Sequence, residues 1–304
     1  MKKKLKLNKK KIFPVNIPHI TNNDIRYVNK ALKSGWISSD GPNVKIFEEK
    51  FSKYINRMIE APLDLPCGAT LKNRIVKSGL SEALGDSKNN PTDALISIFR
   101  RWSQGGAGLL ITGNILIDRW HLEHAGNFVL DRSTDMSKTC ELTKAAKSGG
   151  SLVLAQLSHA GRQTPKAINP DPLSISNLKL DLEGYGQPRM ASDKDFSELI
   201  EKFSTSAKLA QECGFDGVEI HAAHGYLLHS FLSPIANKRN DAYGGTLEGR
   251  ARILKEIAIA IRNNVSNRIP LFCRISAIDG IENGGDMHDS IKLAEILSIS
   301  GVDV

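Results

Sequence analysis

The sequence contains few of the residues that mark secreted proteins, proteins with structural metal ions or membrane proteins. Its four cysteines, at positions 67, 140, 213 and 273, are scattered and form no CxxC pair. This pattern argues against a disulfide framework or structural zinc and favours a reducing compartment. No apolar run approaches the roughly 18 residues of a membrane span, and no apolar stretch follows the lysine-rich start as in a secretion signal. We therefore expect a cytoplasmic protein without a membrane partner.

Positive charge is concentrated at the beginning of the chain. The net charge is +8, yet residues 1–57 alone carry 14 Lys and Arg against 4 Asp and Glu, and residues 58–304 are close to neutral. Such a segment could contact RNA or an anionic membrane, but a solvated tail is the simpler interpretation. The main body has no basic stripe with stacking aromatics, so we expect no nucleic-acid partner.

Strand and helix patterns alternate after the first 60 residues. The expected strands are 74–80, 107–113, 152–157, 217–221, 270–276 and 301–304. The expected helices are 91–103, 134–148, 193–212, 247–264 and 287–299. This alternation is typical of a parallel sheet buried on both faces. It predicts an α/β fold of the TIM (β/α)8 type, incomplete because the chain stops within the sixth of eight strands.

A dense group of polar rings follows the strand expected at 217–221. His221, His224 and Tyr226 lie within six residues, at the strand end where barrel enzymes carry their chemistry. Two imidazoles can donate hydrogen bonds to an oxygen that gains negative charge, and a phenol can supply a proton. Two alternatives stay open: satisfied loop histidines, or the metal site of a barrel hydrolase, although no HExxH arrangement or nearby cysteine completes such a site.

The run from Glu219 to Arg252 resembles the old yellow enzyme family of FMN-dependent oxidoreductases, also called NADH:flavin oxidoreductases. It matches the motif EIHxAHGYLLHxFLSP and then NxRxDxYGG and ExRxR. The LKNR motif at 71–74 and QLxHAGRQ at 156–163 resemble the same family. The resemblance covers residues 58–304 and implies a barrel domain over that range.

The resemblance also implies a reaction and its catalytic residues. In this family NADH or NADPH reduces FMN, and hydride then passes to the β-carbon of an α,β-unsaturated carbonyl. On this chain, His221 and His224 would hold the carbonyl oxygen and Tyr226 would protonate the α-carbon. The expected substrate is a small enone-type molecule, while some relatives reduce dienoyl thioesters or use O₂. The chain is also compatible with a homo-oligomer.

The cofactor-binding residues implied by the resemblance lie in or directly after four of the expected strands: Ser78, Gly79, Leu80, Ser81, Asn114, Gln156 and Arg274. Gln156 can donate and accept through one amide, which suits a flavin edge with C=O and N–H groups. Arg274 would face the N1–C2=O edge and stabilise the reduced flavin anion. Without the resemblance, Ser81 would be an ordinary loop serine, and Arg274 could form a buried salt bridge. No metal ligand set is expected.

The phosphate group of FMN is the weak point of this prediction. Barrels of this type usually bind phosphate at the loops after strands seven and eight, beyond the last residue of this chain. The alternative function is therefore an inactive fusion or truncated fragment that does not bind FMN tightly.

Residues 1–57 resemble a different family. The segment from Pro14 to Ile55 is similar to the beginning of DegT-family PLP-dependent sugar aminotransferases, including the Ser34-Gly35-Trp36 and Gly41-Pro42 sequences. We expect a helix over 23–32, a loop over 35–42 and a second helix over 44–54, which together form a small helical extension. The PLP-binding lysine of that family has no counterpart here, so aminotransferase chemistry is not expected. A gene fusion, a frame or assembly error, or a pseudogene would each produce such a join.

Overall fold

The computed structural model describes residues 22–33 and 42–304. Contacts divide the chain into two compact units, Met1–Met58 and Ile59–Val304. The two expected N-terminal helices are α1 (Asn22–Lys33) and α2 (Pro42–Ile59), and the loop expected between them lies outside the described residues up to residue 41. Across the described ranges, no helix has both the length and the apolar character needed to cross a membrane.

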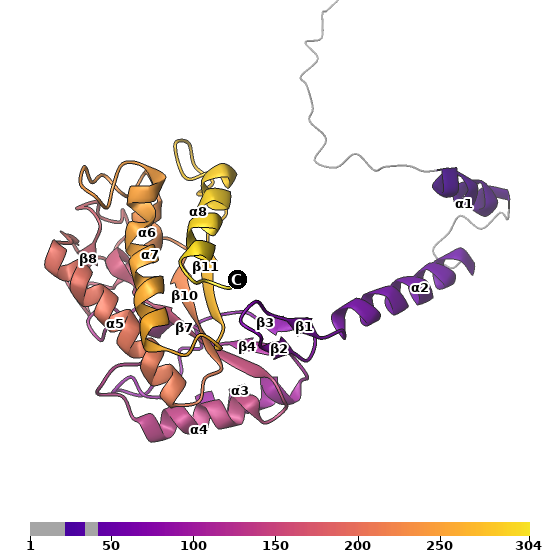
Figure 1. The fold of residues 1–304 in the computed structure, drawn as a ribbon, viewed down its shortest axis with the longest axis horizontal. Helices are drawn as coiled ribbons and strands as arrows, with labels where there is room; N and C mark the ends of the chain where they lie inside the picture. The colour runs from indigo at the N-terminus through magenta and orange to yellow at the C-terminus, as the bar shows by residue number, and fades with distance from the viewer. Residues whose placement is uncertain (1–21, 34–41) are drawn as a thin grey trace, which may run out of the picture. The chain divides into compact units, whose positions relative to one another are not determined.

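A curled parallel sheet forms the centre of the second unit (Figure 1). Its main strands run in the spatial order β11 (Leu271–Ile275), β10 (Gly217–Ala222), β7 (Leu152–Ser158), β4 (Leu109–Ile111) and β3 (Val76–Lys77). Each neighbouring pair along this path is parallel. The α/β fold with barrel-type strand order that the sequence predicted is therefore confirmed, with a first strand shorter than expected.

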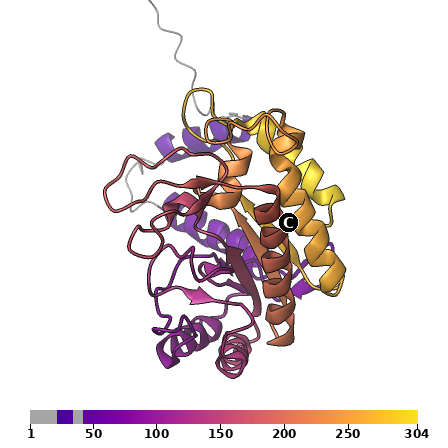
Figure 2. The ribbon, with the colours of Figure 1, turned by 90° about the vertical axis from the view of Figure 1, so that its left-hand side faces the viewer.

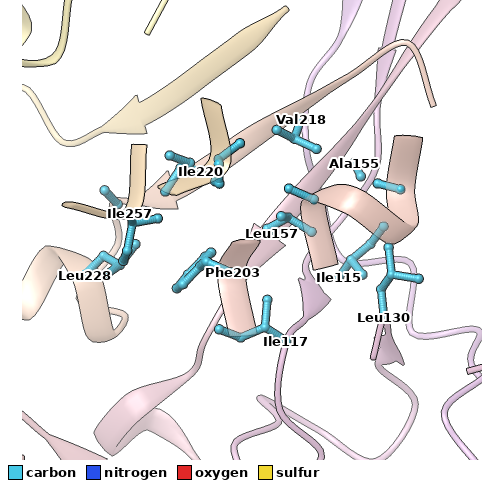
Figure 3. Packing of buried hydrophobic residues seen from close by; sticks show 14 of the residues in the cluster. Ile115, Ile117, Leu130, Ala155, Leu157, Phe203, Val218, Ile220, Leu228 and Ile257 are labelled. Carbon is cyan, nitrogen blue, oxygen red and sulfur yellow. The ribbon is translucent and has the colours of Figure 1, made fainter. Parts of the chain in front are cut away.

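Helices cover the outer face of this sheet. They are α3 (Asp93–Gln104), α4 (Met136–Lys147), α5 (Asp193–Glu212), α7 (Leu247–Asn264) and α8 (Met287–Ile299). Side chains at alternate strand positions, such as Val218 and Ile220, pack in one buried cluster with Phe203 and Ile257 from the helices (Figure 3). The period of two along a strand makes this possible, because successive side chains point to opposite faces.

The intervening strand positions face the inside of the curve. Leu154, Phe272 and Ile111 form a second cluster with Leu65 and Leu71. Leu65 and Leu71 come from a small antiparallel pair, β1 (Leu63–Asp64) with β2 (Thr70–Leu71). Leu65 directly follows β1, and Leu71 ends β2. This pair supplies apolar side chains to the inner face, so the inside of the sheet has an apolar floor beneath the polar groups described below.

Short elements extend the loops at the carboxyl ends of the strands. They are β5 (Ile115–Leu116), β6 (Phe128–Val129), η1 (Gly161–Gln163), β8 (Leu173–Ser174), β9 (Arg189–Met190) and α6 (Leu227–Leu232). Figure 2 shows the segment between β7 and α5 beside α6. Residues 301–304 are not assigned as a strand, although Asp303 N and Val304 O bond to the backbone of β11.

Candidate active site

Four polar side chains lie on the inner face of the sheet, above its apolar floor. Gln156 on β7 is in register with Glu219 on β10, and His221 on β10 is in register with Arg274 on β11. Each occupies the strand position two residues beyond an inward residue such as Leu154 or Phe272. The pleat therefore fixes their direction, and the strand order fixes their neighbours.

Hydrogen bonds join these side chains to the end of β3. Gln156 Nε2 donates to Glu219 Oε1 at 2.5 Å, and Arg274 Nη1 donates to the carbonyl oxygen of Gly79 at 2.9 Å. Burial raises the pKa of Glu219, with the Gln156 hydrogen bond and the Arg274 charge acting in the opposite direction. A Cβ atom at position 79 would lie 2.3 Å from Gln156 Nε2, so the amide can occupy this place only beside a glycine.

The three predicted catalytic rings gather at the end of β10. The centroid of the His221 ring lies 5.0 Å from the centroids of both His224 and Tyr226, and the rings meet edge to face at 85° and 82°. His221 is buried, whereas His224 is exposed and Tyr226 is partly buried. Because the rings pack edge to face, their nitrogen atoms and the phenol oxygen point in different directions.

His221 is held as a neutral hydrogen-bond donor. Its Nδ1 accepts the backbone N–H of Ala223 at 3.2 Å, so the proton of the neutral ring resides on Nε2. Burial, the neighbouring His224 and the charge of Arg274 together lower the pKa of His221 to about 3. Burial and the Arg274 charge also lower the pKa of His224. At neutral pH both rings therefore carry N–H donors without a net charge.

A tight turn positions His224 and Tyr226. His224 has φ of 60° and Gly225 has φ of 77°, both in the left-handed region, which is uncommon for a residue with a side chain and often found at functional sites. Gly225 N donates to His229 Nδ1 at 3.0 Å, and His229 Nε2 lies 3.0 Å from Asp279 Oδ1. The second histidine of the HGYLLH run thus anchors the turn.

Residues that follow the strands β3, β4 and β10 meet at one carboxylate, that of Glu123. Tyr226 Oη and Asn114 Nδ2 each donate to Glu123 Oε2 at 2.5 Å, and Ser81 also forms a hydrogen bond with this carboxylate. Sequence reasoning missed Glu123 because it lies in the irregular segment between β5 and β6, outside every motif. The neighbouring sequence, with Asp118, Arg119, His121 and His124, gives no local signal that singles out Glu123.

Two of the predicted cofactor-binding residues do not join these contacts through their side chains. Ser78 is exposed, and Leu80 is 75% exposed. The Leu80 backbone is nevertheless close to the end of β4, because a Cβ atom at Gly113 would lie 2.3 Å from the Leu80 carbonyl oxygen. The segment 78–81 therefore contributes mainly backbone to this region.

A separate buried group, which we term the closed cluster, consists of Asp118, His121 and His159 near the end of β7. Among the described residues it is the one group of three whose side chains lie close enough together to hold a metal ion. However, the two imidazole rings are stacked, with centroids 4.3 Å apart, and Lys202 Nζ lies 2.5 Å from Asp118 Oδ2. The chain itself thus supplies the cation for this carboxylate.

Comparison with known proteins identifies both parts of the chain. Residues 59–304 match the NADH:flavin oxidoreductase / NADH oxidase family, and residues 18–60 match the DegT/DnrJ/EryC1/StrS aminotransferase family. An NADH-dependent flavin oxidoreductase of Aspergillus parasiticus is 38% identical over 228 residues, which cover 70% of this chain and 51% of that protein. An NADPH dehydrogenase of Halalkalibacterium halodurans is 36% identical over 244 residues, covering 78% and 69%.

The structural comparison agrees with the sequence comparison. The old yellow enzyme homologue from Zymomonas mobilis superimposes with a TM-score of 0.73 at 26% identity, over 81% of this chain and 71% of that one. The chain spans between 34% and 65% of the length of the first four curated relatives. It belongs to the NADH:flavin oxidoreductase / NADH oxidase family, whose cofactors are FMN and a nicotinamide reductant.

Proposed function

We propose that this family member is an FMN-dependent oxidoreductase that uses NADH or NADPH to reduce the activated C=C bond of a small α,β-unsaturated carbonyl compound. One observation carries the proposal. Two neutral imidazoles and a phenol gather at the end of β10, on the same inner face as a buried amide and a guanidinium, Gln156 and Arg274. This face thus combines hydrogen-bond donors for the carbonyl oxygen of a substrate, a source of a proton, and groups suited to a flavin edge.

The polar groups of the inner face fit the chemistry of FMN. A flavin pyrimidine edge presents carbonyl oxygens and an N–H group, and Gln156 can pair with both kinds through one amide. Arg274 adds a fixed positive charge, which would favour the anionic reduced form. The Ser78–Ser81 segment and Asn114 would flank the ring. When bound, FMN supplies the transfer of hydride between the nicotinamide and the substrate carbon.

The chain's own residues would then act on the substrate. Nε2 of His221 and a ring N–H of His224 would donate to the carbonyl oxygen, and such donors are most effective when they are already aligned before charge develops. Because both rings are neutral, they can stabilise this oxygen without giving up a proton to it. Tyr226 would deliver its phenolic proton to the α-carbon.

The division of the chain is part of the proposal. We propose that residues 58–304 form the flavoprotein barrel and that residues 1–57 are an appended aminotransferase-like fragment. The rival proposal is that the chain is an inactive fragment.

Titration of the purified full chain with FMN separates these two proposals. We expect quenching of flavin fluorescence with a stoichiometry of about one, followed by NADH or NADPH oxidation that depends on 2-cyclohexen-1-one. Circular dichroism and urea unfolding would establish that the chain is folded. A folded chain that does not retain FMN would support the inactive fragment and contradict the oxidoreductase.

A further inference from the structure

The carboxylate of Glu123 connects the predicted proton donor with solvent. The Glu123 side chain is 11% exposed, and its Oε2 accepts the Tyr226 hydroxyl and the Asn114 amide, each at 2.5 Å. Its other oxygen, Oε1, lies 3.3 Å from Nε2 of His124, whose side chain is 37% exposed. One oxygen therefore faces the candidate site, and the other faces a ring that reaches water.

The loop that carries this carboxylate is held by Asn127, which is buried. Asn127 Oδ1 accepts the backbone N–H groups of both Glu123 and His124 at 2.9 Å, and its Nδ2 donates to Glu123 Oε1 at 3.2 Å. A side chain fixed at its backbone and at both oxygens has few other orientations. The contact between Glu123 and Tyr226 is thus built into the loop rather than made by a freely rotating surface residue.

Electrostatics restrict how Tyr226 can lose its proton. Burial acts against ionisation of Glu123, but hydrogen bonds from Ser81, Tyr226 and Asn114 outweigh it and lower the pKa of this carboxyl. Burial, and then the hydrogen bond and charge of Glu123, raise the pKa of Tyr226. Departure of the phenolic proton beside an ionised Glu123 would leave two anions in direct contact. Proton loss from Tyr226 therefore requires that another proton reach the pair.

We propose that Glu123 is a positioning residue for Tyr226 and returns a proton to it, with His124 as the solvent-facing donor. This inference rests on the proposed function, in which Tyr226 protonates the substrate α-carbon. In that step the O–H bond of Tyr226 breaks, a C–H bond forms, and the O–H electron pair stays on the phenolic oxygen. Glu123, protonated by the His124 imidazolium, passes that proton to the phenolic oxygen and becomes a carboxylate again.

We term this proton transfer from His124 through Glu123 to Tyr226 the relay, and two further features of it follow from atom balance and geometry. A half-turn of the carboxyl group exchanges its two oxygens, restores the same orientation after the hydrogen bonds re-form, and carries the proton from the His124 side to the Tyr226 side. His124 is then reprotonated by solvent, so each substrate consumes one solvent proton and no additional oxidant or reductant is needed. Besides His124, the titratable groups that act on this pair are His221, which interacts with Glu123, and Tyr185, which interacts with Tyr226.

The first test needs no flavin. The full chain contains five tyrosines, so labelling with ¹³Cζ-tyrosine gives few NMR signals, and Tyr226→Phe identifies that of Tyr226. We expect Glu123→Gln to lower the titration midpoint of Tyr226 by at least about one pH unit, toward the ordinary value near 10. An unchanged midpoint in a folded Glu123→Gln chain would overturn the inference.

A matched control exists elsewhere in the fold. Tyr243 Oη donates to Glu256 Oε2 of α7 at 3.0 Å, and burial and then this contact raise the pKa of Tyr243. Glu256→Gln should lower the Tyr243 midpoint and leave that of Tyr226 in place. A shift of Tyr226 in both variants would mean a general loss of structure and would count against a specific link to Glu123.

The second test uses the FMN-loaded, NADH-reduced chain in single-turnover mixing. Glu123→Gln should slow reoxidation by 2-cyclohexen-1-one by about 10- to 100-fold, within the usual range for lost acid–base assistance. Reoxidation by ferricyanide, which forms no C–H bond, should change less than about twofold. The double variant Glu123→Gln/Tyr226→Phe should be no slower than Tyr226→Phe alone, because Glu123 acts through Tyr226. His124→Asn, a change at a partly exposed residue, should also slow the enone reaction selectively.

The outcomes separate this inference from the proposed function. If the wild-type chain binds no FMN or does not react with the enone, the proposed function fails, and the NMR titration alone decides the link between Glu123 and Tyr226. If Tyr226→Phe is slow but Glu123→Gln and His124→Asn react like wild type, the function stands and the relay is overturned. Equal slowing with ferricyanide and enone would assign Glu123 a purely structural role.

Discussion

Two regions of this molecule carry similar side chains but differ in how far their polar groups are paired within the chain. The closed cluster near the end of β7 contains Asp118, His121 and His159, and the neighbouring strand β10 ends in the open cluster of His221, His224 and Tyr226. Both have two imidazoles, and both have a carboxylate within reach. Only one of them has donors and charges that are already paired within the chain.

Most polar atoms of the closed cluster have partners within the chain, although the buried His121 Nδ1, 3.3 Å from Asp118 Oδ2, makes no hydrogen bond among the described residues. Gly161 N donates to His159 Nδ1 at 3.1 Å, and Leu173 N donates to His121 Nε2 at 3.0 Å. Lys202 Nζ neutralises Asp118, and Trp120 N donates to the other oxygen of that carboxylate at 2.7 Å. Its two rings are stacked, and the ammonium group of Lys202 lies beside the Asp118 carboxylate.

The open cluster is satisfied on one side only. Backbone fixes Nδ1 of His221, and its Nε2–H remains available, while the exposed ring of His224 stands edge-on to it. A histidine pair is therefore informative about function when its second nitrogens lack a partner from the chain.

Of the substitutions considered, removal of the Lys202 ammonium group should lower the free energy of unfolding the most. Lys202→Met leaves Asp118, with 5% of its side chain exposed, without its ammonium partner. We expect the free energy of unfolding to fall by about 3 kcal/mol, at the lower end for a broken buried pair because Lys202 is partly exposed. Urea denaturation measures this.

Lys208→Met on the same helix provides the control for this substitution. Lys208 forms an exposed pair with Glu212 at 4.0 Å, so its loss should cost less than about 1 kcal/mol. If Lys202→Met were as stable as Lys208→Met, the closed cluster would not depend on its internal cation, and the contrast drawn here would be wrong.

The second prediction concerns the pH dependence of the open cluster. Burial lowers the folded-state pKa of His221 to about 3, below the unfolded value near 6.5. The unfolded chain therefore binds the proton first, and stability falls as pH decreases from about 6.5 toward 3. Between pH 7 and pH 4.5 this residue should account for about 2–3 kcal/mol of lost stability. His221→Asn should reduce the loss by that amount, and parallel curves for both proteins would contradict the burial argument.

The smallest expected effect on stability comes from His224→Asn. His224 is exposed, so we expect the free energy of unfolding to change by less than about 0.5 kcal/mol. Loss of one donor to the developing oxyanion should nevertheless slow enone reduction by about 100-fold. A loss of stability comparable to that of Lys202→Met would show that His224 contributes to the stability of the fold, as the closed cluster does, and would contradict its assignment to the open cluster. The paired measurements are urea unfolding and enone turnover.

Much of the framework could be predicted from the sequence because it depends on local signals. The helices α5, α7 and α8 have the predicted bounds, since Ser192, Thr246 and Asp286 cap their first turns. The inward direction of Gln156 and Arg274 follows from the period of two along a strand. The roles of the site residues remain predictions.

The rest depends on contacts between distant segments, which no local pattern encodes. Glu123 meets Tyr226 across 103 positions of sequence, from a loop without helical or strand periodicity. The expected strand at 301–304 makes backbone hydrogen bonds to β11 without being assigned as a strand. The internal pairing of the closed cluster requires Lys202, which lies 84 positions from Asp118.

The account is tested most directly by reoxidation of the FMN-loaded, reduced chain with 2-cyclohexen-1-one, in wild type and in Tyr226→Phe. It predicts that Tyr226→Phe slows this reaction by at least about 100-fold, while FMN binding and reduction by NADH stay within about twofold of wild type. Equal enone reoxidation rates in the two proteins would contradict the assignment of the open cluster as the reacting site.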